Sequence, residues 1–199
     1  MAKLERPRGL TINFSPSERQ YELWNALQPN RCDKCGSTLE MRPCGLDAKG
    51  RAIYQATCTK CGNTDIPEQI LGGGAAGGGK SFLGCCWLVY SCMQFAGIRM
   101  LVARKVRKTL LETTWNTLKD VLMSWGLKEN VNYNINSQTY VITFWNGSTI
   151  MAMDLTPLPS DPDFNSLGSL EITGAFVDEV SEVSEKAIEV LASRIRYKI

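Results

Sequence analysis

Apolar and polar positions along this chain follow the periods of strands and helices in alternation. Residues 99–103 and 172–177 are short apolar runs, which are typical of strands buried in a sheet. Residues 139–145 and 148–153 flank Asn146-Gly147, a pair that favours a two-residue hairpin turn. Strands alternating with helices predict an α/β sheet, and we expect the hairpin to extend one edge of it. Further elements are predicted as a strand at 69–71, helices at 15–27, 81–96, 109–125 and 184–194, and a loop at 155–168.

A glycine-rich segment between the predicted strand 69–71 and the predicted helix 81–96 matches the phosphate-binding pattern G-x-x-x-x-G-K-[ST]. Glycines allow backbone N–H groups to surround phosphate oxygens, the Lys reaches the β- and γ-phosphates, and the Ser hydroxyl can ligate Mg²⁺. A glycine-rich linker is the alternative, but linkers rarely carry Lys-Ser at the amino-terminal end of a helix, where anions bind. The predicted nucleotide-binding residues are Gly74, Ala75, Ala76, Gly77, Gly78, Gly79, Lys80 and Ser81.

An acidic pair, Asp178-Glu179, directly follows the predicted strand 172–177. Ligands of α/β sheets bind beyond the carboxyl ends of the strands. At that place Asp178 would hold Mg²⁺, directly or through water, and Glu179 could orient and deprotonate an attacking water. An acidic pair can also simply end a strand. Combined with a phosphate-binding loop, it predicts hydrolysis of a nucleoside triphosphate.

Four of the eight cysteines form two Cys-x₂-Cys pairs, and a glycine follows each pair. The residues between the pairs contain predicted strands at 37–41 and 51–57, joined by a turn at 45–50. This pattern is typical of a zinc ribbon, in which two tight turns deliver four thiolates to a tetrahedral structural Zn²⁺. Disulfides, which are disfavoured in a cytosolic chain, and coincidence are the alternatives. The predicted zinc ligands are Cys32, Cys35, Cys58 and Cys61, and the predicted buried free thiols are Cys85, Cys86 and Cys92.

Composition narrows the class of protein further. A length of 199 residues with 44% hydrophobic content suits one domain, or one domain with a small insertion. No apolar run approaches the ~18–20 residues that span a bilayer, and residues 1–8 lack the apolar core of a secretion signal. Lys and Arg total 22 against 20 acidic residues, so net charge indicates no nucleic-acid binding and leaves room only for local basic patches. The absence of His excludes His-based acid–base catalysis.

Several segments together resemble the ATPase domain of the phage terminase large subunit, a DNA-packaging motor. The resemblance covers about residues 64–199 and, more loosely, 10–30. Single motifs are generic, whereas their order and spacing are fairly specific. The matching segments are the phosphate loop at 72–81, the strand and basic segment at 101–110, the hairpin at 140–150, the acidic strand end at 174–179 and the arginine-bearing segment at 192–196.

The resemblance implies a P-loop NTPase fold of the ASCE/RecA-like class, with a mostly parallel sheet flanked by helices and a small inserted zinc ribbon. It implies an N-terminal arm and adenine-side helix at 1–30, the ribbon at 31–63 and the ATPase core at 64–199. It also implies that Gln20 recognises adenine, although a solvated helix Gln is the alternative. The phosphate and metal roles fall to Lys80 and Ser81, the metal role to Asp178 and the catalytic-base role to Glu179.

Such motors resemble one another in working as homo-oligomeric rings with an arginine finger, which stabilises charge on the transferred phosphoryl group. Arg104 and Arg107 are the candidate fingers, and Arg194 and Arg196 are further candidates. For each of them the alternative is a solvated or phosphate-steering cation. The implied cofactors are ATP and Mg²⁺ beside structural Zn²⁺. The implied partners are double-stranded DNA, a portal protein and a small terminase subunit, in the cytoplasm of a bacterial host and docked on the viral procapsid.

Two features depart from the family pattern. The zinc ribbon is not a general feature of the family. Its basic residues are equally compatible with contact to DNA or a partner and with simple structural decoration. These residues are Arg31, Lys34, Arg42, Lys49, Arg51 and Lys60. The chain also ends soon after Asp178, where such a sheet normally continues, and it lacks the nuclease domain. We therefore expect a truncated sheet with weak nucleotide binding and slow hydrolysis.

Two other functions compete with a packaging motor. A helicase-like nucleic-acid ATPase would share the core, but common helicases carry a further Asp or His two positions after the Asp-Glu pair, and here Val180-Ser181 follows. The other is a truncated nucleotide- and zinc-binding module without turnover. The intact Lys80, Ser81, Asp178 and Glu179 argue against inertness by design.

Overall fold

The computed structural model describes residues 4–8, 12, 15–27, 31–32, 34–46, 52–64, 69–73 and 78–196. The chain divides into two compact units. One unit comprises Met1–Asn13 with Ser81–Ile199, and the other comprises Phe14–Lys80. None of the described helices has the length and hydropathy that a membrane span requires.

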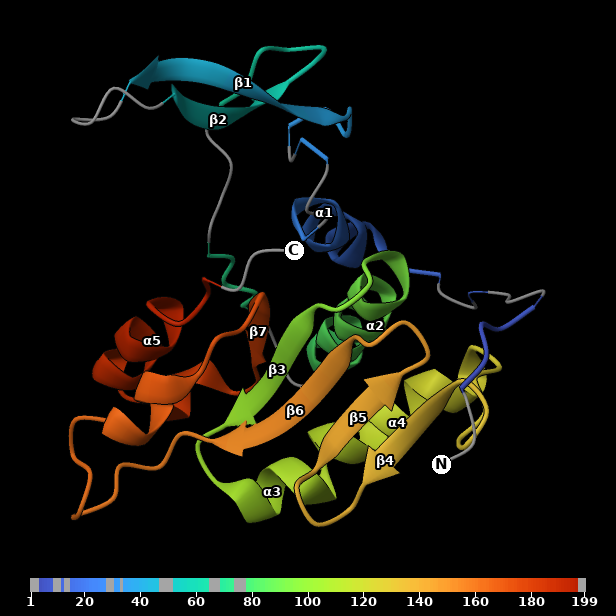
Figure 1. Cartoon of the computed structure of the whole chain (residues 1–199), viewed down its shortest axis with the longest axis vertical. Coiled ribbons are helices and arrows are strands. Elements are labelled where there is room, and N and C mark those ends of the chain that lie inside the picture. Colours follow the sequence, from blue (N-terminus) through green and yellow to red (C-terminus); the bar gives the residue numbers. More distant parts are fainter. Residues whose placement is uncertain are drawn as a thin grey trace. The chain divides into compact units, whose positions relative to one another are not determined.

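The larger unit is built on a five-stranded mixed sheet with the strand order β4-β5-β6-β3-β7 (Figure 1). The central strand β3 pairs in parallel with β6 on one side and with β7 on the other. The strands β4, β5 and β6 form an antiparallel meander that extends the opposite edge. The bounds are Arg99–Arg104 for β3, Tyr133–Asn136 for β4, Val141–Phe144 for β5, Thr149–Asp154 for β6 and Gly174–Val177 for β7.

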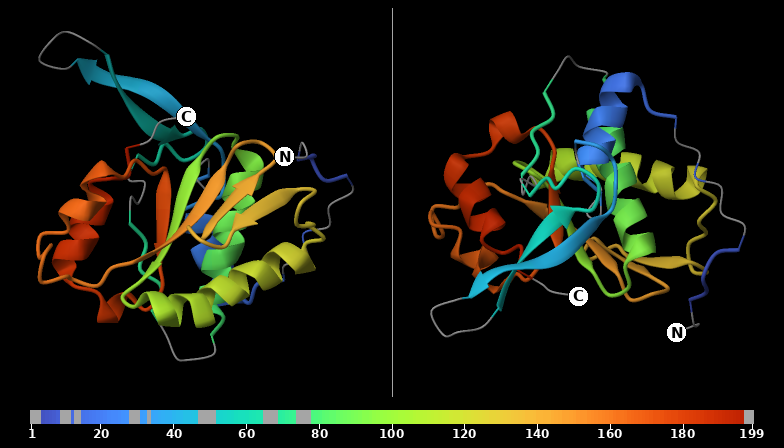
Figure 2. Two further views of the ribbon diagram at one scale, coloured as in Figure 1. Left: turned by 60° about the horizontal axis from the view of Figure 1, so that its bottom comes forward. Right: turned by 90° about the horizontal axis from the view of Figure 1, so that it is seen from above.

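Helices cover both faces of this sheet, as Figure 2 shows. The long apolar helix α2 and the helix α4 lie on one face, and α5 lies on the other with the 3-10 helix η1. Short helices α3 and η2 follow the carboxyl ends of β3 and β7. The bounds are Lys80–Gln94 for α2, Arg107–Glu112 for α3, Thr114–Ser124 for α4, Glu185–Ala192 for α5, Asn165–Ser169 for η1 and Val180–Glu182 for η2.

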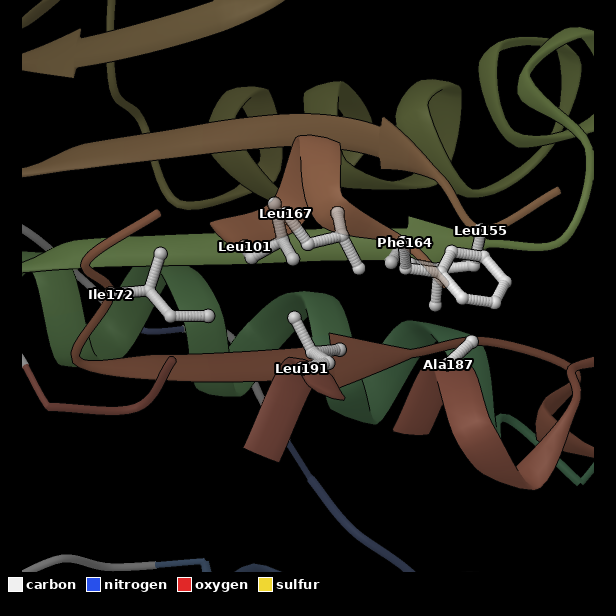
Figure 3. Close-up of a cluster of buried hydrophobic side chains, with 8 residues drawn as sticks. Leu101, Leu155, Phe164, Leu167, Ile172, Ala187 and Leu191 are labelled. Atoms are coloured by element: carbon white, nitrogen blue, oxygen red, sulfur yellow. The ribbon is translucent and has the colours of Figure 1, made fainter. Parts of the chain in front are cut away.

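Alternation along β3 and β7 divides the core between the two faces. On the α5 face, Leu101 and Ala103 lie in a buried cluster with Phe164, Leu167 and other apolar side chains (Figure 3). On the α2 face, an alanine methyl at Gly84 would lie within 2.6 Å of three ring carbons of Phe176. The helix backbone therefore packs directly on a side chain of β7, because glycine leaves room for the ring.

The smaller unit contains the helix α1, Glu18–Ala26, and an antiparallel pair formed by β1, Leu39–Leu46, and β2, Ala52–Cys58. Ser17 caps α1 through a capping box with Gln20, so the helix begins three residues after the predicted start at 15. The pairing of β1 with β2 shifts register between Pro43 and Gly45, as expected where proline lacks an N–H group.

The structure corrects four expectations. The predicted strand at 69–71 does not form, and Leu71 is 79% exposed, whereas a central strand would bury it. The predicted helix at 109–125 is two helices, because Thr113 has φ −118° and ψ −84°, outside the helical region. The strand β4 was missed. The sheet is mixed rather than mostly parallel, because β4 and β5 add two antiparallel pairings.

Candidate functional site

The carboxyl ends of β3 and β7 bring the acidic pair to one edge of the sheet. The N–H group of Asp178 donates to the carbonyl of Ala103 at 2.8 Å, so Asp178 continues the parallel ladder just beyond β7. Its side chain is buried, with the residue 7% exposed. A buried carboxylate is costly unless its oxygens receive hydrogen bonds. Asp178 therefore needs donors close by.

One donor is the serine of the phosphate-binding pattern. The Ser81 hydroxyl donates to Oδ1 of Asp178 at 2.9 Å, which joins two motifs 97 positions apart. Ser81 is the second residue of α2, and Gly79 just before the helix has φ +69°, a conformation that favours glycine. Lys80 begins the helix and is half-buried. The predicted loop residues Gly74, Ala75, Ala76 and Gly77 lie outside the described residues.

A second donor was not identified from the sequence. The Thr114 hydroxyl donates to Oδ2 of Asp178 at 2.5 Å, and Thr114 is only 1% exposed. Thr114 is the first residue of α4 and lies directly after the helix break. A threonine inside a predicted continuous helix carries no signal of such a role.

Glu179 differs from its neighbour in exposure and backbone conformation. It is exposed and has φ 50° and ψ 52°, in the left-handed region. A non-glycine residue in this region costs about 1–3 kcal/mol, and such residues cluster at functional sites. The turn redirects the chain from β7 into η2, and the N–H group of Glu182 donates to the carbonyl of Glu179 at 3.0 Å.

The two candidate arginine fingers contact side chains of their own unit. Arg104 donates through Nη1 to the Thr113 hydroxyl at 3.2 Å, and its Nη2 lies 3.8 Å from Oε1 of Glu182. Its side chain is 15% exposed. Arg107 is exposed, and its guanidinium lies 5.1 Å from the ring centroid of Tyr140, within cation–π range. The assignment of a finger stays a prediction.

The other two arginines lie near the end of α5. Arg194 donates through Nη1 to the carbonyl of Gly168 at 3.0 Å, and Arg196 lies 3.8 Å from Glu171 in an exposed ion pair. Both contacts support the local fold of η1 and α5.

Gln20 belongs to the smaller unit and contacts the phosphate-binding segment there. Its Oε1 accepts the Ser17 N–H at 2.9 Å in the capping box, and its Nε2 donates to the carbonyl of Gly78 at 3.2 Å. The side chain thus connects the start of α1 to the described part of the loop. Recognition of adenine by Gln20 stays a prediction.

The four predicted zinc ligands converge at the base of the β1–β2 hairpin. None of the four forms a disulfide, and their sulfur atoms lie within 4.8 Å of one another. The sulfur pairs Cys35–Cys58, Cys35–Cys61 and Cys32–Cys61 are separated by 3.4, 3.6 and 3.7 Å. A regular tetrahedron with Zn–S bonds of about 2.3 Å has S–S edges of about 3.8 Å. The cluster therefore fits a zinc ion.

Groups around the sulfurs support the same interpretation. The N–H groups of Lys60 and Cys61 both point at the sulfur of Cys58 at 3.4 Å. Hydrogen bonds with the Ser37 side chain and backbone lower the pKa of the Cys35 thiol to about 6. Donors of this kind stabilise the thiolate form, which is the form that binds a metal.

Basic side chains of the ribbon that lie within the described residues are exposed. Lys34 donates to the side-chain Oδ1 of Asn63 at 2.8 Å, and Arg42 lies 3.3 Å from Glu40. Lys60 is exposed at the second Cys-x₂-Cys turn. Lys49 and Arg51 lie outside the described residues.

The remaining helical cysteines are buried free thiols, as predicted. Cys85, Cys86 and Cys92 are 0% exposed on α2. Burial raises the pKa of Cys86 to about 12 and also raises the pKa values of Cys85 and Cys92. These side chains behave as apolar core residues.

The chain is similar to phage terminase large subunits in sequence and in fold. The family model of the phage terminase large subunit matches residues 68–199. The large terminase of a thermophilic bacteriophage (crystal form 2) has a TM-score of 0.52 and 20% identity to this chain, covering 62% of this chain and 30% of its own length. The same protein in complex with ATP-gamma-S (crystal form 3) has a TM-score of 0.47 and 18% identity, with coverages of 62% and 28%. No curated protein matches this chain.

Proposed function

Because the chain belongs to the phage terminase large subunit family, we propose that it is the ATP-hydrolysing motor domain of a DNA-packaging terminase. The observation that carries this proposal is the 2.9 Å hydrogen bond between Ser81 and Asp178. It joins the hydroxyl of a phosphate-binding pattern to a carboxylate at the carboxyl edge of parallel strands. That pairing is what a Mg-nucleotide site of a P-loop protein requires.

In this proposal each residue has a separate role. Lys80 binds the β- and γ-phosphates, and Ser81 with Asp178 would hold Mg²⁺. At these residues Mg²⁺ would supply positive charge that offsets the negative charge developing on the phosphoryl group. Glu179 orients the attacking water and accepts its proton. Gln20 contacts adenine, and Arg104 or Arg107 acts on the phosphoryl group.

The proposal includes the fold class and the domain bounds predicted from the sequence. The core at 64–199 is a P-loop NTPase of the ASCE/RecA-like class, preceded by an arm and adenine-side helix at 1–30. The ribbon at 31–63 binds a structural Zn²⁺. The match spans only 30% of the thermophilic bacteriophage's terminase chain, so the activity, substrates and partners of a whole terminase are part of the proposal and not of the family assignment.

The proposed partners are duplex DNA, a portal protein, a small terminase subunit and further copies of this chain in a ring. The proposed location is the procapsid in the cytoplasm of a bacterial host. Exposed Lys34, Arg42 and Lys60 support a DNA contact by the ribbon. Retention of full DNA affinity after charge reversal at these three positions would exclude that contact.

The test is Mg-ATP turnover of the 199-residue chain with and without duplex DNA, beside a Glu179→Gln variant. Turnover that DNA stimulates and that Glu179→Gln abolishes, while ATP still binds, supports the motor and assigns the base. Strand separation on a forked duplex would instead support the helicase-like alternative. ATP binding without turnover in the wild type would support a nucleotide- and zinc-binding module. Absence of ATP binding would refute the proposal.

A further inference from the structure

The carboxylate of Asp178 is held by two hydroxyl groups, one on each oxygen. Ser81 on α2 donates to Oδ1 at 2.9 Å, and Thr114 on α4 donates to Oδ2 at 2.5 Å. Both donors lie among the described residues, and each binds a different oxygen of the Asp178 side chain. Two donors on different oxygens fix the plane of a carboxylate, whereas one donor leaves it free to rotate.

Thr114 is itself held in place through its backbone. Its carbonyl accepts a hydrogen bond from the Cys85 thiol at 3.6 Å. Cys85 lies four residues after Ser81, so both residues occupy one face of α2. The same helix face therefore contacts the backbone of Thr114 and the carboxylate that the Thr114 hydroxyl binds.

The break between α3 and α4 places Thr114 at the end of a polar chain. The Thr113 hydroxyl lies 3.4 Å from that of Thr114, accepts from Nη1 of Arg104 at 3.2 Å and donates to the Thr109 carbonyl at 2.7 Å. Arg104 in turn lies 3.8 Å from Glu182, just after the acidic pair. The ends of β3 and β7 are thus linked through the helix break.

Hydroxyl chemistry gives this arrangement a function. A serine hydroxyl has one proton and two lone pairs. Because the Ser81 proton is donated to Asp178, the direction of the carboxylate decides where the lone pairs of Ser81 point. A side chain that fixes the carboxylate also fixes the orientation of the serine ligand, as groups behind metal ligands commonly do.

We propose that Thr114 is a positioning residue of the Mg-nucleotide site, which acts by orienting Asp178 and, through Asp178, the Ser81 hydroxyl. This inference rests on the proposed function of the same site. It assigns to α4 a role that neither sequence motif contains. A purely structural threonine would contribute to stability and leave the Mg²⁺ dependence of nucleotide binding unchanged.

The experiment compares binding of a fluorescent ATP analogue, with and without Mg²⁺, in Thr114→Val, Thr114→Ser and Thr117→Val. Valine keeps the shape and removes the hydroxyl, and serine restores it. Thr117 is the matched control, because it lies one turn further along α4 and its hydroxyl bonds only the Thr113 carbonyl, at 3.3 Å. We expect Thr114→Val to raise the half-saturating Mg²⁺ concentration about 10- to 100-fold, with Mg-free binding unchanged. The half-saturating Mg²⁺ concentration of Thr114→Ser should stay within about threefold of the wild-type value, and that of Thr117→Val should equal the wild-type value.

A double-mutant cycle with Asp178→Asn tests whether Thr114 acts through this carboxylate. If Thr114 acts through Asp178, then Thr114→Ser and Thr114→Val should have no further effect on Mg²⁺ dependence in an Asp178→Asn background, since coupled neighbours are not additive. Two results would overturn the inference while leaving the proposed function intact. One is an equal Mg²⁺ dependence of nucleotide binding in wild type and Thr114→Val, and the other is an equal loss of nucleotide affinity with and without Mg²⁺. Absence of nucleotide binding by the wild-type chain would refute the proposed function, and this inference with it.

Discussion

Replacement of Gly84 by alanine tests how closely the phosphate-binding helix must approach the strand that carries the acidic pair. A Cβ atom at this position would lie 2.4, 2.5 and 2.6 Å from Cζ, Cε2 and Cε1 of Phe176. Ordinary carbon contacts are about 3.5–4.0 Å. Either α2 or the ring must therefore move by about 1 Å. Ser81 lies one turn earlier on α2, so a shift of the helix would lengthen its 2.9 Å hydrogen bond to Asp178 beyond the usual range.

The size of the effect follows from two opposing contributions. Overpacking a core costs about 1–3 kcal/mol, and alanine is about 1 kcal/mol more favourable than glycine inside a helix. We expect a net loss of about 1 kcal/mol in the free energy of unfolding. For a chain of about 200 residues this corresponds to a fall in Tm of about 2–4 °C. Affinity for Mg-ATP should fall as well, because the helix shift disturbs Ser81.

The assay is a double-mutant cycle of Gly84→Ala with Phe176→Leu, followed by thermal unfolding at saturating zinc. Leucine removes the ring carbons that meet the new methyl, so the double variant should recover most of the loss caused by Gly84→Ala. Gly168→Ala is the matched control, because an added Cβ there meets no atom within 4 Å. A coupling energy within about 0.5 kcal/mol of zero, which is the scatter of independent sites, would refute the argument.

Three further predictions concern zinc, alkaline pH and the hairpin turn. In hydrogen-exchange measurements, zinc chelation or Cys58→Ser should remove amide protection from β1 and β2 but not from β3, because a two-stranded hairpin alone is only marginally stable. Amide protection of β1 and β2 that survives chelation would contradict this prediction. Cys85, Cys86 and Cys92 keep their protons in the folded state, with the pKa of Cys86 raised from 9.0 to about 12. Above pH 9 these thiols ionise only in the unfolded state, so the free energy of unfolding should fall by about 1.4 kcal/mol per pH unit for each thiol. In urea titrations at pH 8 to 10, Cys86→Ala should reduce this fall by about a third. Asn146→Asp should lower the free energy of unfolding by about 1–2 kcal/mol in the same titration at pH 8, because it removes the amide donor to the carbonyl of Cys92 on α2. An unchanged urea midpoint would contradict this prediction.

The junction of the two sequence motifs could be predicted because its causes are local. The residues at 78–81 and the pair Asp178-Glu179 each follow from short-range chemistry, and the meeting of strand ends in a parallel sheet is a general rule. The structure brings Ser81 and Asp178 together accordingly. The convergence of Cys32, Cys35, Cys58 and Cys61 could be predicted for the same reason, since two tight turns and their spacing lie within one hairpin.

The contribution of Thr114 could not be predicted, because it depends on a backbone break that periodicity does not reveal. Apolar spacing across 109–125 is that of one helix, and only the dihedral angles of Thr113 divide it. The strand β4 was missed for a related reason: its sequence, Tyr133–Asn136, is half asparagine, a residue depleted in strands. In contrast, 69–71 has the apolar composition of a strand and does not form one, since three residues give too little pattern to decide.

The hairpin turn shows how one local signal can serve two structural purposes. Asn146-Gly147 was predicted to be a turn from its own chemistry, and the structure also uses it to end α2. The Asn146 amide donates to the carbonyl of Cys92 at 2.8 Å, and the Ser148 hydroxyl donates to the carbonyl of Phe95 at 2.6 Å. Such donors satisfy carbonyls that the last turn of a helix leaves without partners. Because Ser81 attaches the first turn of α2 to Asp178, the helix is held at both ends by the sheet, and a change at either end should reach the other through a rigid element.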